Sequence, residues 1–262
     1  MRTFFRIFLC LILPVLGQVP LTTDRPDQTE SAALVPLKSV QIETGISVEQ
    51  TGFVYPNGRI DIRNYNILGT LVRYGLKSNV ELRIATGYLY DSVKRDYPAF
   101  PGPDGYQKVN SELDDVSLGV KLPLLATENG LNGALLAAVQ LPLGIDEQVR
   151  DKIGASAILA LGHGLGRRFG VGYNLGAVRS TTGDRLLKYS AVMSAAVTGN
   201  AGLFIEFFGA SYEKANPVLR WDTGITVAVN PTLQWDFFAG FPVNDYAPDI
   251  MLGAGLSIRF DR

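Results

Sequence analysis

Charged side chains stand singly within apolar stretches of this chain, at every second position of an alternating pattern. In Val80-Glu81-Leu82-Arg83-Ile84, an acid and a base occupy the same face of an extended chain. Such a face could select a dissolved solute, or its charges could pair and fill the space between strands. Acids and bases are nearly balanced on it, which leaves both interpretations open. The residues are Glu43, Glu49, Glu81, Asp115, Glu206, Asp222, Asp236, Arg73, Arg83, Lys121, Lys188 and Arg259.

Residues suited to catalysis or metal binding are few. The chain has one histidine, His163, and one cysteine, Cys10. His163 precedes a predicted tight turn on the outward face, and no G-x-S-x-G segment supplies a serine nucleophile. Gly253-Ala254-Gly255 falls in a predicted strand, not before a helix, so it is no phosphate loop. We expect no enzyme activity, no metal and no cofactor; a membrane-embedded hydrolase that uses His163 is the alternative.

The composition combines high hydropathy with the absence of a membrane-spanning helix. The 262 residues are 47% apolar and 19% charged, with a mean hydropathy of +0.13. No apolar run reaches the roughly 18 residues of a spanning helix. The net charge of −1 leaves no basic footprint for nucleic acid. The single cysteine excludes an internal disulfide and a cysteine-based zinc site.

Alternation with a period of two predicts β-strands along the whole body of the chain, and no stretch sustains a helical period. Clear strands are expected near 40–49, 80–90, 115–122, 170–176, 221–229, 233–241 and 250–260. Weaker ones are expected near 63–74, 133–143, 154–163, 187–197 and 202–211. Together they make about twelve strands, and an even number returns the chain to its starting side, as a closed up-and-down barrel requires.

Three features favour a membrane barrel over a secreted soluble β-protein. The segments match the ~9–11 residues that cross a bilayer at a tilt, whereas soluble strands are mostly near 5–6 residues. Short turns alternate with longer links, above all the proline-rich link from Asp91 to Asp114. Aromatic residues gather near the segment ends, as in interfacial girdles. The sequence therefore predicts an all-β, closed antiparallel up-and-down transmembrane β-barrel.

The N-terminus has the parts of a secretory signal peptide. Arg2 and Arg6 flank an apolar run that ends at Leu16, and Gly17 supplies a small residue for cleavage. We expect a signal peptide over residues 1–17, a periplasmic N-terminal segment over 18–38 and the barrel over 39–262. Because Cys10 lies in the signal peptide, the mature chain would contain no cysteine.

The polar segment before the first strand has two interpretations. It could be a plug that enters the barrel and pairs with charges on the inward face, or it could be a periplasmic linker. The residues that would carry the plug are Asp24, Arg25, Asp27 and Glu30.

The chain resembles the bacterial phenol-degradation MetA-pathway family, which is common in Bacteroidetes-type bacteria. The most specific part is Thr22-Thr23-Asp24-Arg25-Pro26-Asp27, and Val40-Gln41-Ile42-Glu43-Thr44-Gly45 follows it. Further similarity lies at Asp115-Val116-Ser117-Leu118-Gly119 and at Leu233-Gln234-Trp235-Asp236, so it covers nearly all of the mature chain. The resemblance implies an outer-membrane barrel of undetermined solute. The chain departs from the usual pattern at its end, because Asp261-Arg262 follows Phe260.

These observations together predict a monomeric outer-membrane barrel that acts as a passive channel for a small hydrophilic or aromatic solute. Its expected partners are outer-membrane lipid, the barrel-assembly machinery and the solute. An enzyme within the membrane and a structural barrel with an ion-paired, closed lumen are the alternatives.

Overall fold

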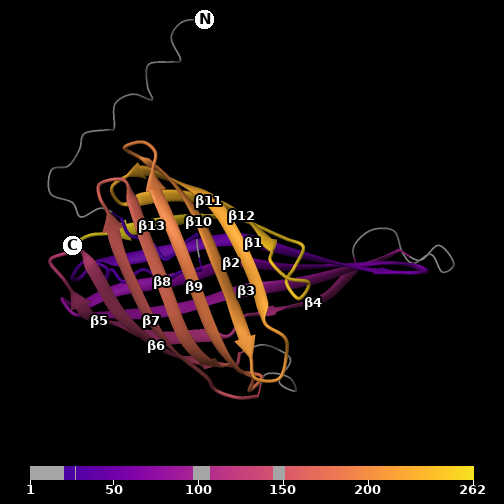
Figure 1. The fold of residues 1–262 in the computed structure, drawn as a ribbon. Helices are drawn as coiled ribbons and strands as arrows, with labels where there is room; N and C mark the ends of the chain where they lie inside the picture. The colour runs from indigo at the N-terminus through magenta and orange to yellow at the C-terminus, as the bar shows by residue number, and fades with distance from the viewer. Residues whose placement is uncertain (1–20, 27, 97–106, 144–150) are drawn as a thin grey trace, which may run out of the picture.

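Twelve antiparallel strand positions form one closed barrel in the computed structural model, which describes residues 21–26, 28–96, 107–143 and 151–262 (Figure 1). The predicted signal peptide lies outside these residues. Nowhere in these ranges is there a helix long and apolar enough to cross a membrane. The strands are β1 (Val40–Tyr55), β2 (Gly58–Lys77), β3 (Val80–Asp96), β4 (Gln107–Leu113), β5 (Val116–Ala126), β6 (Leu131–Leu141), β7 (Gly154–Leu165), β8 (Phe169–Arg179), β9 (Arg185–Ala196), β10 (Ala201–Tyr212), β11 (Val218–Asn230), β12 (Leu233–Pro242) and β13 (Ile250–Phe260).

The barrel closes because its first strand pairs with its last. Val40 of β1 lies opposite Phe260 of β13, and β2 pairs with both β1 and β3. The thirteen segments fill twelve positions because β4 and β5 are parts of one interrupted strand, and both pair with β3. Closure leaves no unpaired edge along the barrel. The predicted fold class and strand number are confirmed.

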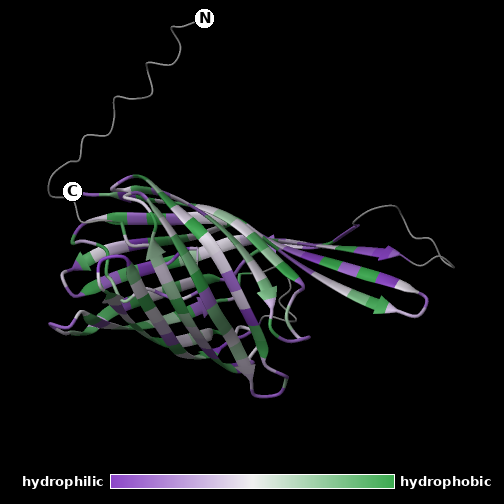
Figure 2. Ribbon diagram, turned by 45° about the horizontal axis from the view of Figure 1, so that its top comes forward, coloured by the Kyte–Doolittle hydropathy of each residue, from purple (hydrophilic) through white to green (hydrophobic). Residues whose placement is uncertain are grey.

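Apolar and charged side chains lie on opposite faces of the strands. Along β3, Leu82 and Ile84 are 38% and 51% exposed, whereas Glu81 and Arg83 between them are 0% and 9% exposed. Figure 2 shows hydrophobic and hydrophilic residues alternating along the strands around the barrel. The apolar side chains therefore point outward, and the charged ones point into the lumen.

The two ends of the barrel differ in their connections. Short turns, such as Ser78–Asn79 between β2 and β3, lie at the end where β1 begins and β13 ends, which we call the turn end. Longer links, such as 243–249 between β12 and β13, lie at the opposite end, the loop end. The predicted alternation of connection lengths is thus present, although β1 and β2 are joined at the loop end by a short turn at residues 56–57.

The prediction of a loop from Asp91 to Asp114 is wrong for most of the residues that the structure describes in this range. β3 continues to Asp96 and pairs with β2 as far as Arg59, while β4 adds a third paired segment. These strands project beyond the barrel as an arm on the right of Figure 1. The parts of the arm that β3 and β4 contribute have polar residues on both faces, so they lack the alternation that reveals a strand, although their backbone groups still pair.

Candidate functional site

The N-terminal segment, residues 21–26 and 28–38, lies inside the barrel. Near the turn end, the Thr22 carbonyl accepts a hydrogen bond from Gln41 Nε2 at 2.9 Å. Farther along the lumen, the Gln28 backbone amide donates to Glu206 Oε2 at 2.7 Å. The chain then returns, and the Val35 amide donates to Glu81 Oε2 at 2.8 Å, before β1 begins. The segment thus runs up one side of the lumen and back.

Asp24 is the centre of the contacts between the segment and the wall. Its Oδ2 atom lies 2.6 Å from Arg83 Nη1, 3.0 Å from Lys121 Nζ and 3.1 Å from Arg73 Nη1. Burial alone would raise the pKa of Asp24, but the charges of Arg73, Lys121 and Arg83 outweigh burial and hold that pKa well below its usual range. One carboxylate from the segment thus holds three cations from β2, β3 and β5.

Wall carboxylates complete this Asp24 cluster. Arg73 Nε lies 2.8 Å from Glu81 Oε1, and Arg73 Nη1 lies 2.9 Å from Glu43 Oε1. Glu30 of the segment lies 2.7 Å from Arg83 Nη2. Arg73, Glu43 and Glu81 side chains are fully buried, so water cannot replace their partners, and removal of one partner would leave a buried charge. The cluster consists of Asp24, Glu30, Glu43, Arg73, Glu81, Arg83 and Lys121.

Arg25 occupies a space that two glycines leave open. Gly45 of β1 lies opposite Gly255 of β13, and both belong to the inward face. A Cβ atom added to either would overlap the Arg25 guanidinium, so a larger residue at either position would displace it. Arg25 Nη2 also lies 3.3 Å from Asp236 Oδ1. The glycines therefore determine how closely the segment approaches the wall.

The tip of the segment contacts β8, β9 and β10. The Thr29 hydroxyl donates to Glu206 and lies 2.7 Å from Ser190 Oγ. Asn174 accepts a hydrogen bond from the Glu30 amide at 2.6 Å and donates one to the Glu30 carbonyl at 3.0 Å. These polar contacts of the tip are thus made with inward side chains of the wall.

The remaining predicted inward residues lie outside the Asp24 cluster. Asp222 is fully buried opposite Glu206 in the β10–β11 register. Asp115 accepts a hydrogen bond from Thr181 at 2.5 Å, and Arg259 pairs with Asp261 at 2.7 Å. Lys188 lines an open cavity near the loop end. Asp27 falls outside the described residues.

Several lumen residues were not among the predicted site residues. Arg220 pairs with Glu49 across the lumen at 2.5 Å. The sequence-based strand began at Trp221, one residue later; alternation counted back from Asp222 would have placed Arg220 on the inward face. Asn174 and Ser190 carry no charge, so only their contacts with the segment identify them.

The geometry around His163 lacks the partners of a catalytic histidine. His163 lies opposite Val171 on the outward face, and its ring centroid is 6.0 Å from that of Tyr173. Among the described residues, no group of three or more histidine, cysteine, aspartate or glutamate side chains could hold a metal ion. The inward charges can instead hold the N-terminal segment in place and set the electrostatic potential along the lumen.

The comparisons with known proteins agree with this fold. A family model described as "Putative MetA-pathway of phenol degradation" matches residues 23–260. The crystal structure of an outer membrane channel from Pseudomonas putida F1 is similar with a TM-score of 0.61 and 11% identity, covering 86% of this chain and 97% of that one. The KdgM porin in complex with disordered oligogalacturonate gives a TM-score of 0.54 and 5% identity, covering 85% of this chain and 99% of that one. No curated protein sequence matches the chain.

Proposed function

We propose, since the chain belongs to the MetA-pathway phenol-degradation family, that it is a passive outer-membrane channel for a small solute, with the N-terminal segment as its plug. The observation that carries this proposal is the Asp24 cluster, in which the segment supplies the carboxylate that three wall cations share. The solute would pass when the segment leaves its place in the lumen.

The outward face supports insertion into a membrane. Large apolar side chains such as Ile84, Leu175 and Phe237 are 51%, 59% and 49% exposed. Exposure of many such side chains around a barrel is unfavourable in water, whereas their contact with lipid tails is favourable. The closed strand pairing also satisfies the backbone groups that lipid cannot. The two similar solved structures are themselves a channel and a porin.

The width of the barrel supports a role for the plug. Barrels of about eight strands are filled by side chains, and those of about sixteen leave an aqueous channel. Twelve strand positions lie between these cases, so the extra volume can hold either water or an inserted segment. Here the segment occupies part of the turn-end half of the lumen, and a cavity of about 490 Å³ remains between residues 21–26 and strands β8 to β12.

The proposal also includes how the chain is exported and how the barrel is oriented in the membrane. Residues 1–17 would be a signal peptide that is removed after export, and the barrel-assembly machinery would insert a monomer into the outer membrane. The turn end would then face the periplasm, where the N-terminal segment enters the lumen. We do not assign an enzyme activity to the chain.

Flux through liposomes tests the proposal. The full-length mature chain and a variant that lacks residues 20–35 are reconstituted, and swelling is measured with small sugars, organic acids and aromatic solutes. We expect slow passage through the full chain and passage severalfold faster through the deletion variant.

The control is heat-modifiable migration on gels, which shows that both proteins are folded barrels. If neither folded protein passes any solute, the chain is a structural barrel and the channel function is wrong. If both pass solutes at the same rate, the segment is not a plug.

A further inference from the structure

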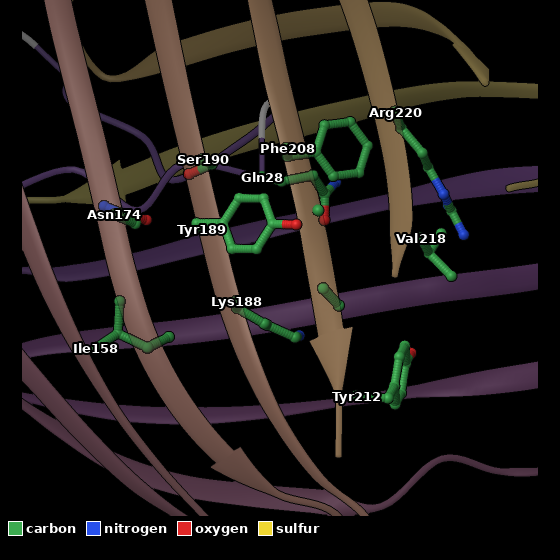
Figure 3. Close-up of a pocket in the computed structure, with 12 residues that line it drawn as sticks. Gln28, Ile158, Asn174, Lys188, Tyr189, Ser190, Phe208, Tyr212, Val218 and Arg220 are labelled. Carbon is green, nitrogen blue, oxygen red and sulfur yellow. The ribbon is translucent and has the colours of Figure 1, made fainter. Parts of the chain in front are cut away.

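A cavity remains in the loop-end half of the lumen, beyond the tip of the N-terminal segment. Its volume is about 220 Å³, and inward residues of β7 to β11 form most of its lining (Figure 3). Gln28, Asn174 and Ser190 form its polar side next to the segment. A solute that enters from the loop end would therefore meet this loop-end cavity before it meets the plug.

The charges that line the loop-end cavity are all positive. They belong to Lys188 of β9 and Arg220 of β11, and no other charged residue among those that the structure describes is part of the lining. Glu49 partly neutralises Arg220 from across the lumen. Within the described parts of the chain, Lys188 has no carboxylate partner, and its side chain is exposed to the cavity. An anion would therefore gain at least one uncompensated ion pair here.

Another part of the lining, next to Arg220, is apolar. Ile158, Phe208 and Val218 contribute hydrocarbon side chains, and Tyr212 contributes a ring. The Arg220 guanidinium carbon lies 6.0 Å from the centroid of the Phe208 ring, within reach of a cation–π contact. Figure 3 shows Arg220 beside Phe208, with Lys188 extending from the neighbouring strand. The cavity thus presents cationic groups next to a hydrocarbon surface.

We infer that the loop-end cavity binds a small organic carboxylate with an apolar body. The carboxylate would accept hydrogen bonds from Lys188 and Arg220, and the apolar body would lie against Ile158, Phe208 and Val218. Typical sites for drug-sized ligands measure about 300–1,000 Å³, so a cavity of about 220 Å³ fits a smaller molecule, such as one with a single ring. The inference rests on the proposed channel function, for which it names the class of solute.

Calorimetric titration of the folded, full-length mature chain in detergent tests this site. Benzoate is the probe, and benzamide and benzylamine are its neutral and cationic counterparts of similar shape. We expect benzoate to bind at least about tenfold more tightly than benzamide, because hydrogen bonds to a charged group are the stronger kind. Benzylamine should not bind.

Substitutions in the lining locate the binding. Lys188→Gln should weaken benzoate binding about tenfold, and Ala210→Phe should abolish it by filling the cavity. The matched control is Lys214→Gln, which removes a lysine that is exposed and outside the lining, and which should leave the affinity unchanged. Heat-modifiable migration confirms that each variant is folded.

Equal affinity for benzoate and benzamide, no benzoate binding by the folded chain, or full affinity in Lys188→Gln would overturn the inference. The liposome measurements separate this failure from failure of the channel function. A chain that passes solutes but does not bind benzoate remains a channel without this site. A chain that binds benzoate but passes no solute keeps the site and loses the proposed transport.

Discussion

The turn-end and loop-end halves of the lumen are lined by the same kind of alternating strand, yet their charges are arranged differently. At the turn end, Arg73, Arg83 and Lys121 share Asp24 and are buried with it. At the loop end, Lys188 has no carboxylate partner among the described residues and faces an open cavity. The difference follows the N-terminal segment, because the turn-end cations are neutralised by the acid that it brings, whereas Lys188 stays available to an anion beyond its reach.

Asp24→Ala should disturb the turn-end half most. It leaves three buried cations without their shared partner, and removal of one member of such a group costs about 3–5 kcal/mol. We expect the segment to leave the lumen, so that single-channel conductance in planar bilayers approaches that of the variant without residues 20–35. The control Asp245→Ala removes an exposed acid and should conduct like the unmodified chain. Unchanged conductance in Asp24→Ala would show that the cluster does not hold the segment.

Acid should release the segment in a defined range of pH. Burial raises the pKa of Asp24, but the positive charges of Arg73, Lys121 and Arg83 lower it by more. The pKa of Asp24 is therefore lower in the docked segment than in the free one. Its contribution to docking is therefore complete above the pKa of a free aspartate, about 3.9, and is lost as the pH falls below that value. Burial raises the pKa of Glu30 in the docked segment to about 7, so its protonation favours docking as the pH falls from 7 to 5. Conductance should therefore not rise between pH 7 and about pH 5, and it should rise below about pH 4.

The matched control for acid release is Asp24→Asn, which cannot titrate. Its conductance should already be raised at neutral pH, and it should change less on acidification than that of the unmodified chain. Opening of the unmodified chain between pH 7 and 5 would contradict the assignment to Asp24.

Gly255→Val should have a smaller effect. The added side chain would take the space of the Arg25 guanidinium, and overpacking of this kind costs about 1–3 kcal/mol. We expect the segment to be cut faster by added protease while heat-modifiable migration of the barrel stays normal. Gly199→Val is the control, because a Cβ at Gly199 meets no atom within 4 Å. Equal protection in both variants would show that the glycine pair does not position Arg25.

Lys188→Gln should leave the turn-end half unaffected. Lys188 makes no contact with Asp24 and is exposed to the cavity, so protease protection of the segment should match that of the unmodified chain. The preference for anions over cations, measured as reversal potential in the variant without residues 20–35, should decrease slightly. A loss of protection would mean that the two halves are coupled.

The barrel could be predicted from the sequence because its signal is local. A period of two fixes the face of each residue, and so Glu81, Arg83 and Lys121 could be assigned to the lumen before their partners were known. The arm could not be predicted, since Asp91–Asp96 has polar residues on both faces.

The Asp24 cluster could be predicted only as one of two alternatives. Asp24 was a candidate plug residue, but its contacts with β2, β3 and β5 depend on a segment that folds back within the barrel, and local alternation carries no such information. The loop-end cavity was not predicted for another reason. One of its two cations, Arg220, lies near the start of β11, outside the stretch in which the alternating pattern was recognised.

A reversible crosslink tests the central claim, that the segment must leave the lumen for a solute to pass. Thr29 Oγ1 and Ser190 Oγ are 2.7 Å apart, so cysteines at both positions are close enough for a disulfide. Thr29→Cys with Ser190→Cys is made in the mature chain that begins after Gly17, and liposome swelling is measured before and after reduction, with each single variant as control. We predict no passage in the oxidised protein and normal passage after reduction. Equal passage in both states would contradict the account.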